Sequence, residues 1–308
     1  MAETASPQRI LITGASGLVG SALFSALERS GHRVIKLVRG SASDTPGKAT
    51  WDPDAVRIDL SSAGTLDAVV HLAGEPIAKR WTPDMKRRIR DSRVKGTRLL
   101  SDALARLPAP PKVLVCASAT GWYGDRGEEW LDESSDPGRG FLAETCQEWE
   151  AAAAAAREAG IRVVHLRIGL VLSPKGGALA KMLPVFRLGL GGRLGSGRAY
   201  WSWITLDDLL EVIQHALANE ALRGAVNAVS PHPVTNAEFT KTLGGVLRRP
   251  AILPVPRFAV ELLFGEMGRE AMLASFRVKP AKLIETGFKF QFSELAPAFR
   301  HLLRGART

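Results

Sequence analysis

The stretch Arg9–Gly20 reads RILITGASGLVG, and it decides how the chain begins to fold. Its first five residues form an apolar run typical of a buried strand. Gly14, Gly17 and Gly20 follow as a GxxGxxG array that leads into a helical pattern from Leu18 to Ser30. Glycines at this spacing let the backbone turn sharply, approach a ligand closely and pack the helix on the strand. The stretch therefore predicts a strand, a tight turn and a helix whose N-terminus can bind phosphate.

The same alternation of strand and helix continues through the first two thirds of the chain. Further strands are expected at Arg33 to Val38, Ala68 to Leu72, Lys112 to Ala117 and Ile161 to Ile168. The clearest helix begins with Thr82 as its N-cap and Pro83 as its first residue, and it ends before the prolines of PAPPK. This order is typical of a parallel sheet covered by helices on both faces. We expect an α/β fold, a Rossmann-type doubly wound parallel sheet with a smaller, interleaved C-terminal lobe on the substrate side.

The domain boundary is expected near residue 170, where the pattern changes to the glycine-rich run RLGLGGRLGSGRAYWSWI and then to shorter elements. Residues 1–170 are interpreted as the nucleotide-binding core, and residues 171–308 as the substrate-side lobe. This lobe is expected to return late strands to the core, including Ala225 to Val229, and to contain a small C-terminal domain from about residue 248.

Composition excludes several classes of protein. The chain has 308 residues, of which 45% are hydrophobic, so it can fill a large core. Neither a signal peptide nor an apolar run long enough to span a membrane is visible. The two cysteines, Cys116 and Cys146, are far apart, and the six histidines show no metal-binding spacing, so no metal site is expected. GxSxG and GxxxxGK[ST] are absent. We expect a cytoplasmic protein without a metal ion.

The formal net charge of +10 could indicate nucleic acid as a partner. The densest basic cluster, however, follows one helix whose other side carries Met85, Ile89, Leu100 and Leu104. A solvated helix face explains this pattern, although some of these arginines could also face an anionic cofactor. We therefore expect no nucleic-acid partner, and the absence of a long apolar run predicts no membrane partner.

The glycine array predicts a dinucleotide, because it follows a strand and opens a helix within a βαβ unit. The second strand ends about 20 residues later, where proteins that bind NAD carry an acidic residue for the ribose hydroxyls. Here the sequence is VIKLVRGS, and Arg39 occupies the acidic position, with Lys36 and Ser41 nearby. A guanidinium can pair with the 2′-phosphate of NADP. The sequence therefore favours NADP(H) over NAD(H).

The chain resembles the extended short-chain dehydrogenase/reductase superfamily through three motifs: TGASGLVG, DAVVHLAG at Asp67 to Gly74, and SATGWYG at Ser118 to Gly124. HLAGEPIAKRW, FLAETCQEWE and GLGGRLGSGRAYWSWITLDDL make it similar to an atypical subgroup, the NAD(P)-dependent epimerase family proteins. RRPAILPVPRFAVELLFGEMG and PAKLIETGFKF resemble the small C-terminal domain of that subgroup.

This resemblance implies a Rossmann sheet that carries NADP(H). It also implies a set of cofactor-binding positions in the glycine turn, at the end of the second strand, after the strand that ends near Leu72, and on the basic helix. These positions are Gly14, Ser16, Gly17, Leu18, Val19, Gly20, Val38, Arg39, Leu72, Ala73, Gly74, Arg88 and Arg93. Arg93 stands where extended members have an Asn, since the sequence here is RVKGT.

The acid/base pair typical of the superfamily is absent. YxxxK would let the Lys lower the pKa of the Tyr, but Phe141 and Thr145 occupy these positions. Ser118 matches the family's catalytic Ser, with Thr120 as the alternative in an uncertain alignment. Tyr123, on the loop that leaves the same strand, is the main candidate for a substitute proton donor.

Other candidates remain open. Cys146 and Glu144 are alternative proton donors, although Cys146 on an amphipathic helix also fits a small buried residue. In the stretch Gly189 to Trp203, Trp201 and Trp203 could line a substrate pocket and Arg198 could bind an anionic group. The same stretch could instead pack the two lobes together.

We therefore expect an NADP(H)-dependent oxidoreductase or epimerase-type enzyme acting on a small carbonyl or hydroxyl compound, with an unusual or solvent-derived proton source. The alternative is a protein that binds NADP(H) without turnover and uses its surface for regulation or interaction. A homodimer is compatible with the fold, and nothing in the sequence identifies the substrate.

Overall fold

The computed structural model describes residues 6–40 and 48–304 of the chain. Its largest element is an eight-stranded, mostly parallel sheet with the strand order β12-β8-β6-β5-β1-β2-β3-β4. The strands are β1 (Arg9–Thr13), β2 (Arg33–Arg39), β3 (Thr50–Asp52), β4 (Arg57–Asp59), β5 (Ala68–His71), β6 (Val113–Ala119), β8 (Arg162–Ile168) and β12 (Gly224–Ala228). Only β4 runs antiparallel to its neighbour in this sheet. The predicted Rossmann-type fold is confirmed.

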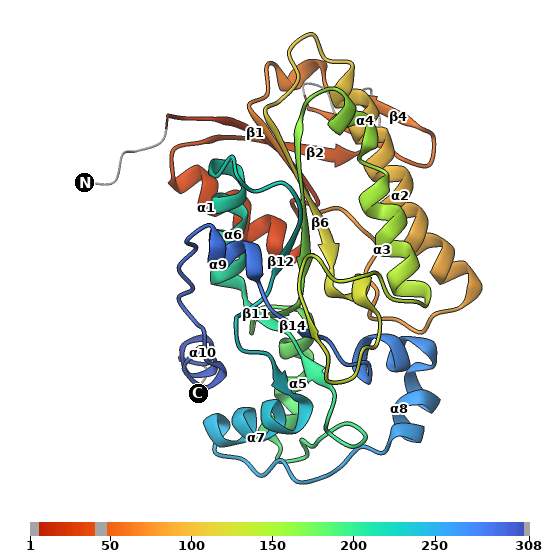
Figure 1. Cartoon of the computed structure of the whole chain (residues 1–308), viewed down its shortest axis with the longest axis vertical. Helices are drawn as coiled ribbons and strands as arrows, with labels where there is room; N and C mark the ends of the chain where they lie inside the picture. Colours follow the sequence, from red (N-terminus) through yellow and green to blue (C-terminus); the bar gives the residue numbers. More distant parts are fainter. Residues whose placement is uncertain (1–5, 41–47, 305–308) are drawn as a thin grey trace.

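Helices cover both faces of this sheet (Figure 1). On one face lie α1 (Leu18–Arg29) and α6 (Leu206–Ala218). On the other face lie α2 (Pro83–Ala105), α3 (Phe141–Ala151) and α4 (Ala154–Glu158). Each layer has its own core of aliphatic side chains, because every strand of a doubly wound sheet turns alternate residues to opposite faces.

The expected helix of the basic cluster is confirmed as α2. The Thr82 hydroxyl accepts a hydrogen bond from the Met85 amide at 3.2 Å, and Pro83 is the first helical residue. Its apolar side is buried at Ile89, Leu100 and Leu104. Most of the cationic side chains on its other side are exposed and several form ion pairs, for example Lys95 with Asp91.

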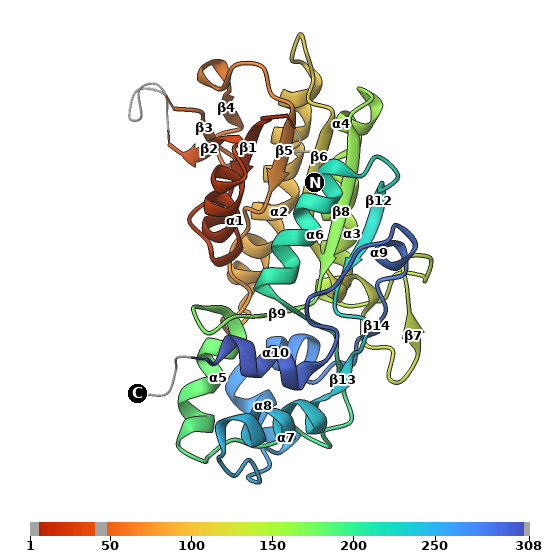
Figure 2. The ribbon, with the colours of Figure 1, turned by 90° about the vertical axis from the view of Figure 1, so that its left-hand side faces the viewer.

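A smaller lobe lies below the sheet in the views of Figures 1 and 2. It contains α5 (Gly177–Arg187), α7 (Asn236–Leu247), α8 (Arg257–Phe264), α10 (Leu295–Leu302) and a π-helical turn, Gly268–Met272. Short strand pairs accompany these helices: β9 (Leu170–Leu172) with β11 (Trp203–Thr205), β10 (Tyr200–Trp201) with β13 (Val234–Thr235), and β7 (Trp130–Leu131) with β14 (Arg277–Val278). The α9 helix (Ala281–Glu285) packs back on β12.

The two parts of the chain are interleaved. The chain enters the smaller lobe after β8, returns to the large sheet as β12, and then leaves it again. β7, from the first half of the sequence, pairs with β14 near its end. Among the described residues, no helix is long and apolar enough to cross a bilayer.

His165 is an unusual residue of the core. It lies on β8 with 3% of its surface exposed, and neither ring nitrogen has a hydrogen-bond partner among the described residues. Burial lowers the pKa of His165 to about 4 from an ordinary value near 6.5, although the charge of Glu150 opposes the decrease. The folded chain therefore holds this ring neutral, whereas the unfolded chain protonates it below about pH 6.5.

We predict that His165→Leu makes the free energy of unfolding depend less on pH between pH 6.5 and 4. The unfolded state binds the extra proton between pH 6.5 and 4, so the histidine lowers the free energy of unfolding as the pH falls through that window. At pH 5 this loss is roughly 2 kcal/mol, and the variant should lack it. Urea denaturation at pH 5 and pH 8 measures the difference. Exposed His232 provides the control variant His232→Leu, and equal behaviour of the two variants would contradict the assignment.

Candidate functional site

The carboxyl ends of β1 and β5 meet at the point where the strand order reverses direction. Thr13 is the last residue of β1, and its hydroxyl oxygen accepts hydrogen bonds from the amides of Leu72 and Ala73, each at 3.1 Å. This bond ties the glycine turn after β1 to the segment after β5. Doubly wound sheets bind their ligands at such a switch point.

Two of the three glycines are required by the protein itself. Gly14 has a φ of 68°, and a Cβ there would lie 2.8 Å from the carbonyl carbon of Leu72. A Cβ on Gly20 would lie 2.2 Å from the Gly14 oxygen. Gly17 differs, because a Cβ there would meet only the Gly14 oxygen at an ordinary 3.4 Å. Packing within the chain therefore does not explain why residue 17 is a glycine.

The N-terminus of α1 has free backbone amides that a ligand could bind. Gly17 is the N-cap, no side chain of the described residues caps the helix, and its first turn contains no acidic residue. The first amide groups of a helix lack partners within the helix and carry a partial positive charge. Ser16 and Gly17 are exposed, and Leu18 and Val19 are half-buried. This turn can bind an anionic group such as a phosphate.

A chain of buried hydrogen bonds lies directly behind the turn. The Thr13 hydroxyl contacts His71 Nδ1 at 2.7 Å, and His71 Nε2 contacts the Thr97 hydroxyl at 2.9 Å. Trp149 Nε1 donates to the same Thr97 oxygen at 2.8 Å. Burial lowers the pKa of His71 to about 4, so the ring is neutral. Because the Thr13 oxygen already accepts two amides, its proton goes to Nδ1 and His71 carries its own proton on Nε2.

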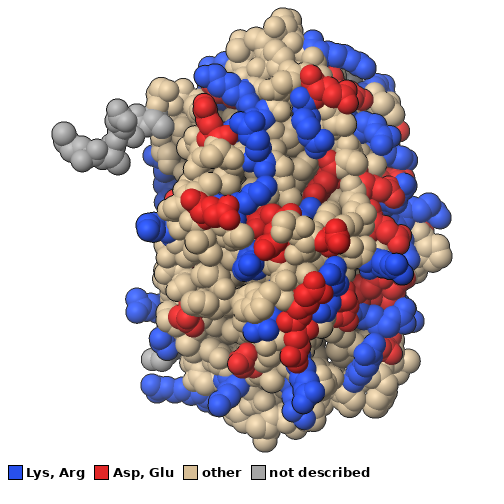
Figure 3. Space-filling model, viewed as in Figure 1, with Lys and Arg blue, Asp and Glu red and all other residues tan. Residues whose placement is uncertain are grey.

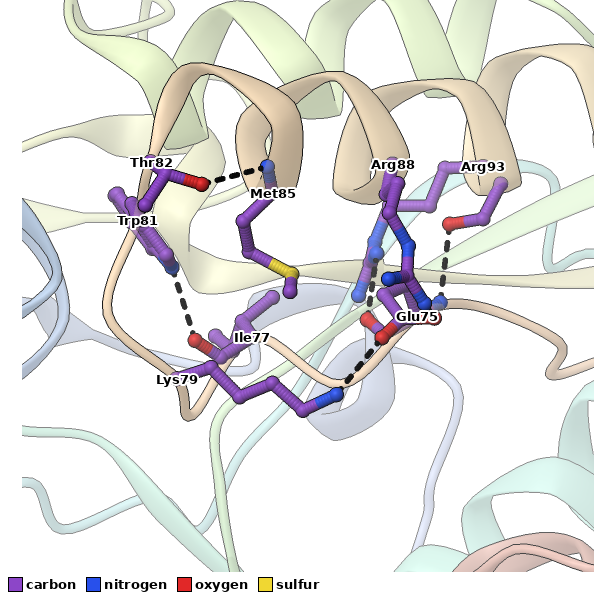
Figure 4. Close-up of polar contacts among 9 residues, drawn as sticks. Glu75, Ile77, Lys79, Trp81, Thr82, Met85, Arg88 and Arg93 are labelled. Carbon is purple, nitrogen blue, oxygen red and sulfur yellow. Dashed lines mark hydrogen bonds and ion pairs between the residues drawn. The ribbon is translucent and has the colours of Figure 1, made fainter.

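The segment after β5 brings charged side chains from α2 to the same place (Figure 4). Glu75 is mostly buried and pairs with Lys79 at 3.1 Å and with Arg88 at 3.3 Å. Burial alone would raise the pKa of Glu75, but the hydrogen bond from Lys79 and the charge of Arg88 outweigh it and lower the pKa. The carboxylate is therefore ionised beside the predicted cofactor residues.

Arg93 lies under this segment. Its Nη1 donates to the carbonyl oxygens of Glu75 and Ile89, each at 3.0 Å, and its guanidinium lies over the Trp149 ring. A Cβ on Gly74 would approach the Arg93 guanidinium carbon to 3.3 Å, so Gly74 lets the backbone lie close to this side chain. Arg93 thus holds the backbone of residues 74 and 75 in position.

The end of β2 supplies the other predicted cofactor residues. Val38 is half-buried and Arg39 is exposed, with no ion pair to a carboxylate of the described residues. Lys36 is also exposed and lies over the Phe24 ring. Ser41 lies outside the described residues.

Ser118 lies at the carboxyl end of β6 with 3% of its surface exposed. Its hydroxyl donates to Glu150 Oε1 at 2.7 Å. The same carboxylate accepts two hydrogen bonds from Arg167, at 2.9 and 3.0 Å. Burial would lower the pKa of Arg167, but its bonds to Glu150 raise it instead, so the ion pair is held together inside the protein. The Ser118 proton is therefore directed at Glu150.

Tyr123 is fully buried. Its hydroxyl donates to Asn227 Oδ1 at 2.8 Å and accepts from Arg167 Nη1 at 3.1 Å. Burial raises the pKa of Tyr123 to about 12 although Arg167 opposes the increase. To pass a proton to a substrate, this phenol would first have to leave Asn227. The role of Tyr123 as a proton donor stays a prediction of the sequence.

Phe141 and Thr145, at the positions of the usual Tyr and Lys, pack against other side chains of the protein. Phe141 stacks edge-on against Trp81, with ring centroids 5.0 Å apart, and Lys86 lies over its face. Thr145 and Cys146 are buried, and burial raises the pKa of the Cys146 thiol to about 12. Glu144 is exposed.

The smaller lobe contributes a carboxylate to this region. Glu270, in the π-helical turn, accepts hydrogen bonds from the amides of Phe141 and Leu142 at 3.2 and 2.9 Å. It thereby caps α3, whose own N-cap residue is Gly140. Glu266 pairs with Lys86 of α2 at 2.8 Å. The C-terminal lobe thus holds the two helices that carry Arg88, Arg93 and the Phe141 position.

The predicted pocket residues lie in different environments. Trp201 and Trp203 have 8% and 0% of their surface exposed and belong to the core of the smaller lobe. Trp203 Nε1 donates to the His232 oxygen at 3.0 Å, and Trp201 stacks on Phe239. Both rings therefore pack within the smaller lobe rather than between the two lobes, and their role as walls of a substrate pocket stays a prediction. Arg198 is exposed, and Thr120 is buried beside Ser118.

Sequence reasoning did not find Glu75, His71, Thr97, Glu150 and Glu270. Glu75 directly follows LAG in HLAGE, so its place next to the cofactor segment was a usable signal. The others act through contacts between segments far apart in the chain, for example Glu270 with Phe141, and no local pattern marks them. Among the described residues, no group of three or more His, Cys, Asp or Glu side chains is arranged to hold a metal ion.

Two family models match the chain. Residues 10–228 match the model described as NAD dependent epimerase/dehydratase family. Residues 255–302 match one described as Domain of unknown function (DUF1731). The second match spans α8, α9, α10, the π-helical turn with Glu270, and Glu266 just before that turn.

Known proteins resemble the chain over almost its full length. It is 43% identical to Epimerase family protein Mb2239 of Mycobacterium bovis over 94% of this chain and 95% of that protein. It is 36% identical to Epimerase family protein SDR39U1 of Homo sapiens, over 96% and 99%. A crystal structure of the human protein with NADPH matches with a TM-score of 0.85 over 96% of this chain and 99% of that chain, at 35% identity. UDP-N-acetylglucosamine 4-epimerase from Bacillus cereus, at 18% identity and a TM-score of 0.74, shares the fold.

Proposed function

The chain belongs to the NAD dependent epimerase/dehydratase family, and from that membership we propose that it binds NADP(H) at the junction of β1 and β5. We further propose that it is an oxidoreductase or epimerase-type enzyme acting on a small carbonyl or hydroxyl compound. Bound NADP(H) supplies a hydride donor or acceptor. The protein binds and orients both partners and controls the proton.

The observation that carries this proposal is the glycine turn. Gly14 and Gly20 are required for packing, but the space beside Gly17 is not filled by the chain. The helix that starts there has no side-chain cap. A pyrophosphate would use both features, because its oxygens can accept the free amides and need a close approach to the backbone.

The choice of NADP(H) rests on Arg39 and on the solved relative. Arg39 is exposed at the end of β2, where an acidic residue would favour NAD. The human relative SDR39U1 has been crystallised with NADPH. Glu75 and Arg88, at the other side of the turn, add an ionised group that can accept a hydrogen bond and a cation that can pair with phosphate.

Ser118 is the side chain that we propose contacts the substrate oxygen. Its proton is directed at Glu150, so its oxygen has lone pairs that can accept a hydrogen bond from a substrate hydroxyl. Glu150 is fixed by Arg167 and keeps Ser118 in this orientation. The Tyr123 proton is bonded to Asn227, and burial raises the pKa of the Cys146 thiol to about 12, so solvent is the proposed proton source for reduction of a carbonyl.

The second candidate function is binding of NADP(H) without turnover. It is favoured by the packing of Phe141 where the superfamily has a catalytic Tyr, and by the hydroxyl of Tyr123, which is bonded on both sides. In that case the cofactor would stabilise the turn, the segment after β5 and the helix α2, and hence the surface that they form.

We predict that Gly17→Ala weakens NADPH binding by roughly tenfold or more and changes the free energy of unfolding of the free protein little. The new methyl group has room in the protein but occupies the space for the pyrophosphate. Tryptophan fluorescence titration and urea denaturation give the two values. Gly20→Ala is the matched comparison and should destabilise the fold itself, because its Cβ would overlap the Gly14 oxygen. Unchanged NADPH binding in Gly17→Ala would argue against a cofactor at this turn.

A second prediction concerns the selectivity for the 2′-phosphate. Arg39→Asp removes the cation and adds a repelling charge, so NADPH binding should weaken by about tenfold or more while NADH binding changes much less. Parallel titrations with NADPH and NADH measure this ratio, with Arg33→Asp on the same strand as the control. Equal effects on both nucleotides would show that Arg39 does not contact the phosphate.

The third prediction separates the two candidate functions. If the chain is an enzyme, a panel of carbonyl and sugar-nucleotide compounds should contain at least one that consumes NADPH, followed by absorbance. Ser118→Ala should then reduce the rate by roughly tenfold or more and leave the NADPH affinity unchanged. Tyr123→Phe reports on the predicted proton donor. Tight NADPH binding with no consumption over the whole panel would favour the non-catalytic function.

A further inference from the structure

Large apolar side chains are exposed on the smaller lobe. In the described part of the chain, most exposed residues of this kind lie between Val185 and Leu263. Ile252 is 80% exposed, Leu188 is 74% exposed, and Phe258 and Leu262 are each 71% exposed. Apolar groups gathered on one part of a surface usually mark a site of contact with another body.

These side chains come from segments that run beside each other. The Leu253 amide donates to the Gly191 oxygen at 3.2 Å, and the Val255 amide donates to the Arg193 oxygen at 2.8 Å. The stretch that holds Leu188 and Leu190 therefore lies along the stretch that holds Ile252 and Leu253. Phe258 and Leu262 follow on α8 at i and i+4, which places them on one side of that helix.

We call these six side chains the apolar tip: Leu188, Leu190, Ile252, Leu253, Phe258 and Leu262. The connection from α7 to α8, which holds Ile252 and Leu253, lies at the end of the lobe away from the large sheet, at the bottom of Figure 1. From there α8 leads back toward the start of α2, and Arg80 Nη1 donates to the Leu262 oxygen at 3.3 Å. Figure 3 shows mostly uncharged atoms at the lower end, with Lys and Arg side chains beside them and some Asp and Glu side chains above.

Three arginines lie close in sequence to residues of the apolar tip. Arg187 precedes Leu188, and Arg248 and Arg249 lie just before Ile252. All three line a groove of about 1270 Å³ between α5, α7 and α10, together with Lys241, Arg300 and Arg304. Its only acidic side chain, Glu238, is bonded to Thr235 in the capping box of α7. Within the described residues, none of the six cations forms an ion pair.

We propose that the apolar tip and its arginines form a docking surface for an anionic lipid membrane. The apolar side chains enter the interfacial region of the bilayer, and Arg187, Arg248 and Arg249 contact the phosphates of the head groups. The contact is peripheral, since it uses protruding side chains of loops and a short helix.

Charge and shape favour a membrane over other occupants. In a symmetric dimer the same patch meets itself, so two grooves lined by arginines would be brought together and repel each other. A protein partner would need pockets for side chains that protrude separately from a helix and two loops. A fluid lipid surface accommodates protruding side chains without such pockets.

The sequence had predicted no membrane partner, and this proposal departs from that prediction. That expectation rested on the absence of a long apolar run. The apolar tip is built from two stretches, 188–190 and 252–262, about 60 residues apart in the chain, and their exposure is not visible in the sequence. A peripheral contact needs no membrane-spanning helix, so it agrees with the finding that no helix of the described residues is long and apolar enough to cross a bilayer.

The test is flotation of the full chain with lipid vesicles in a density gradient. Vesicles of phosphatidylcholine with phosphatidylserine should carry the chain upward, vesicles of phosphatidylcholine alone should carry much less, and added salt should weaken binding. Ile252→Asn combined with Phe258→Asn should lower the partition coefficient by roughly tenfold or more, because both apolar side chains leave the bilayer. Arg248→Glu with Arg249→Glu should give a loss of similar size.

The control is Val56→Asn, which removes another exposed apolar residue far from the smaller lobe and should float like the unaltered chain. All variants are first shown to melt at the same temperature as the unaltered chain and to bind NADPH equally well. The proposal is overturned if the unaltered chain does not float with the anionic vesicles, or if the tip variants float equally well. Light scattering gives a further test. If the unaltered chain is a dimer and the tip variants are monomers, a second copy of the chain occupies this surface and the proposal is overturned.

Discussion

The contact between the glycine turn and the end of β5 is the constraint on which the site depends. Gly14 lies so close to Leu72 that no side chain fits between them, and Thr13 bonds the amides of Leu72 and Ala73. The same hydroxyl begins the buried chain through His71 and Thr97 to Trp149. A polar chain inside a protein is stabilising only when every member is bonded. The turn is thus fixed in place before any ligand arrives, which lowers the cost of ordering it on binding.

A second buried network surrounds the candidate catalytic residues Ser118 and Tyr123. Glu150 and Arg167 form an ion pair with well-matched geometry, and Ser118 and Tyr123 both bond to it. Breaking one side of such a pair leaves a buried charge without a partner, so the pair is rigid. Rigidity orients Ser118 but also takes up the protons of Ser118 and Tyr123. The arrangement positions groups well and offers few mobile protons, which is why binding without turnover remains a second candidate function.

The smaller lobe holds two helices of the large sheet in position. Glu270 caps α3 and Glu266 pairs with Lys86 on α2, so residues near the C-terminus hold both helices on one face of the large sheet. The apolar cluster around Trp81, Phe141 and Met267 adds to the same contact. The residues matched by the domain of unknown function therefore stabilise the segment after β5 that we assign to the cofactor. The same lobe carries the apolar tip, so one lobe contains both the contact with the cofactor-binding part and the proposed contact with lipid.

Local pattern in the sequence was enough to predict six strands of the large sheet, the glycine turn, and the helix that begins at Thr82, because these depend on apolar runs, glycine spacing and a capping hydroxyl. It did not predict the short strands β3 and β4, whose three residues each are too few to show a pattern. It also determined that the YxxxK pair is absent. The free space beside Gly17, which Gly14 and Gly20 lack, is visible in the folded chain alone, since it depends on what lies across the turn. The same holds for the burial of Tyr123, the packing of Trp201 and Trp203, and the bond from Phe141 to Glu270, which join residues far apart in the chain. Local periodicity places residues on elements, whereas partners across the fold decide which side chains are exposed, charged or bonded.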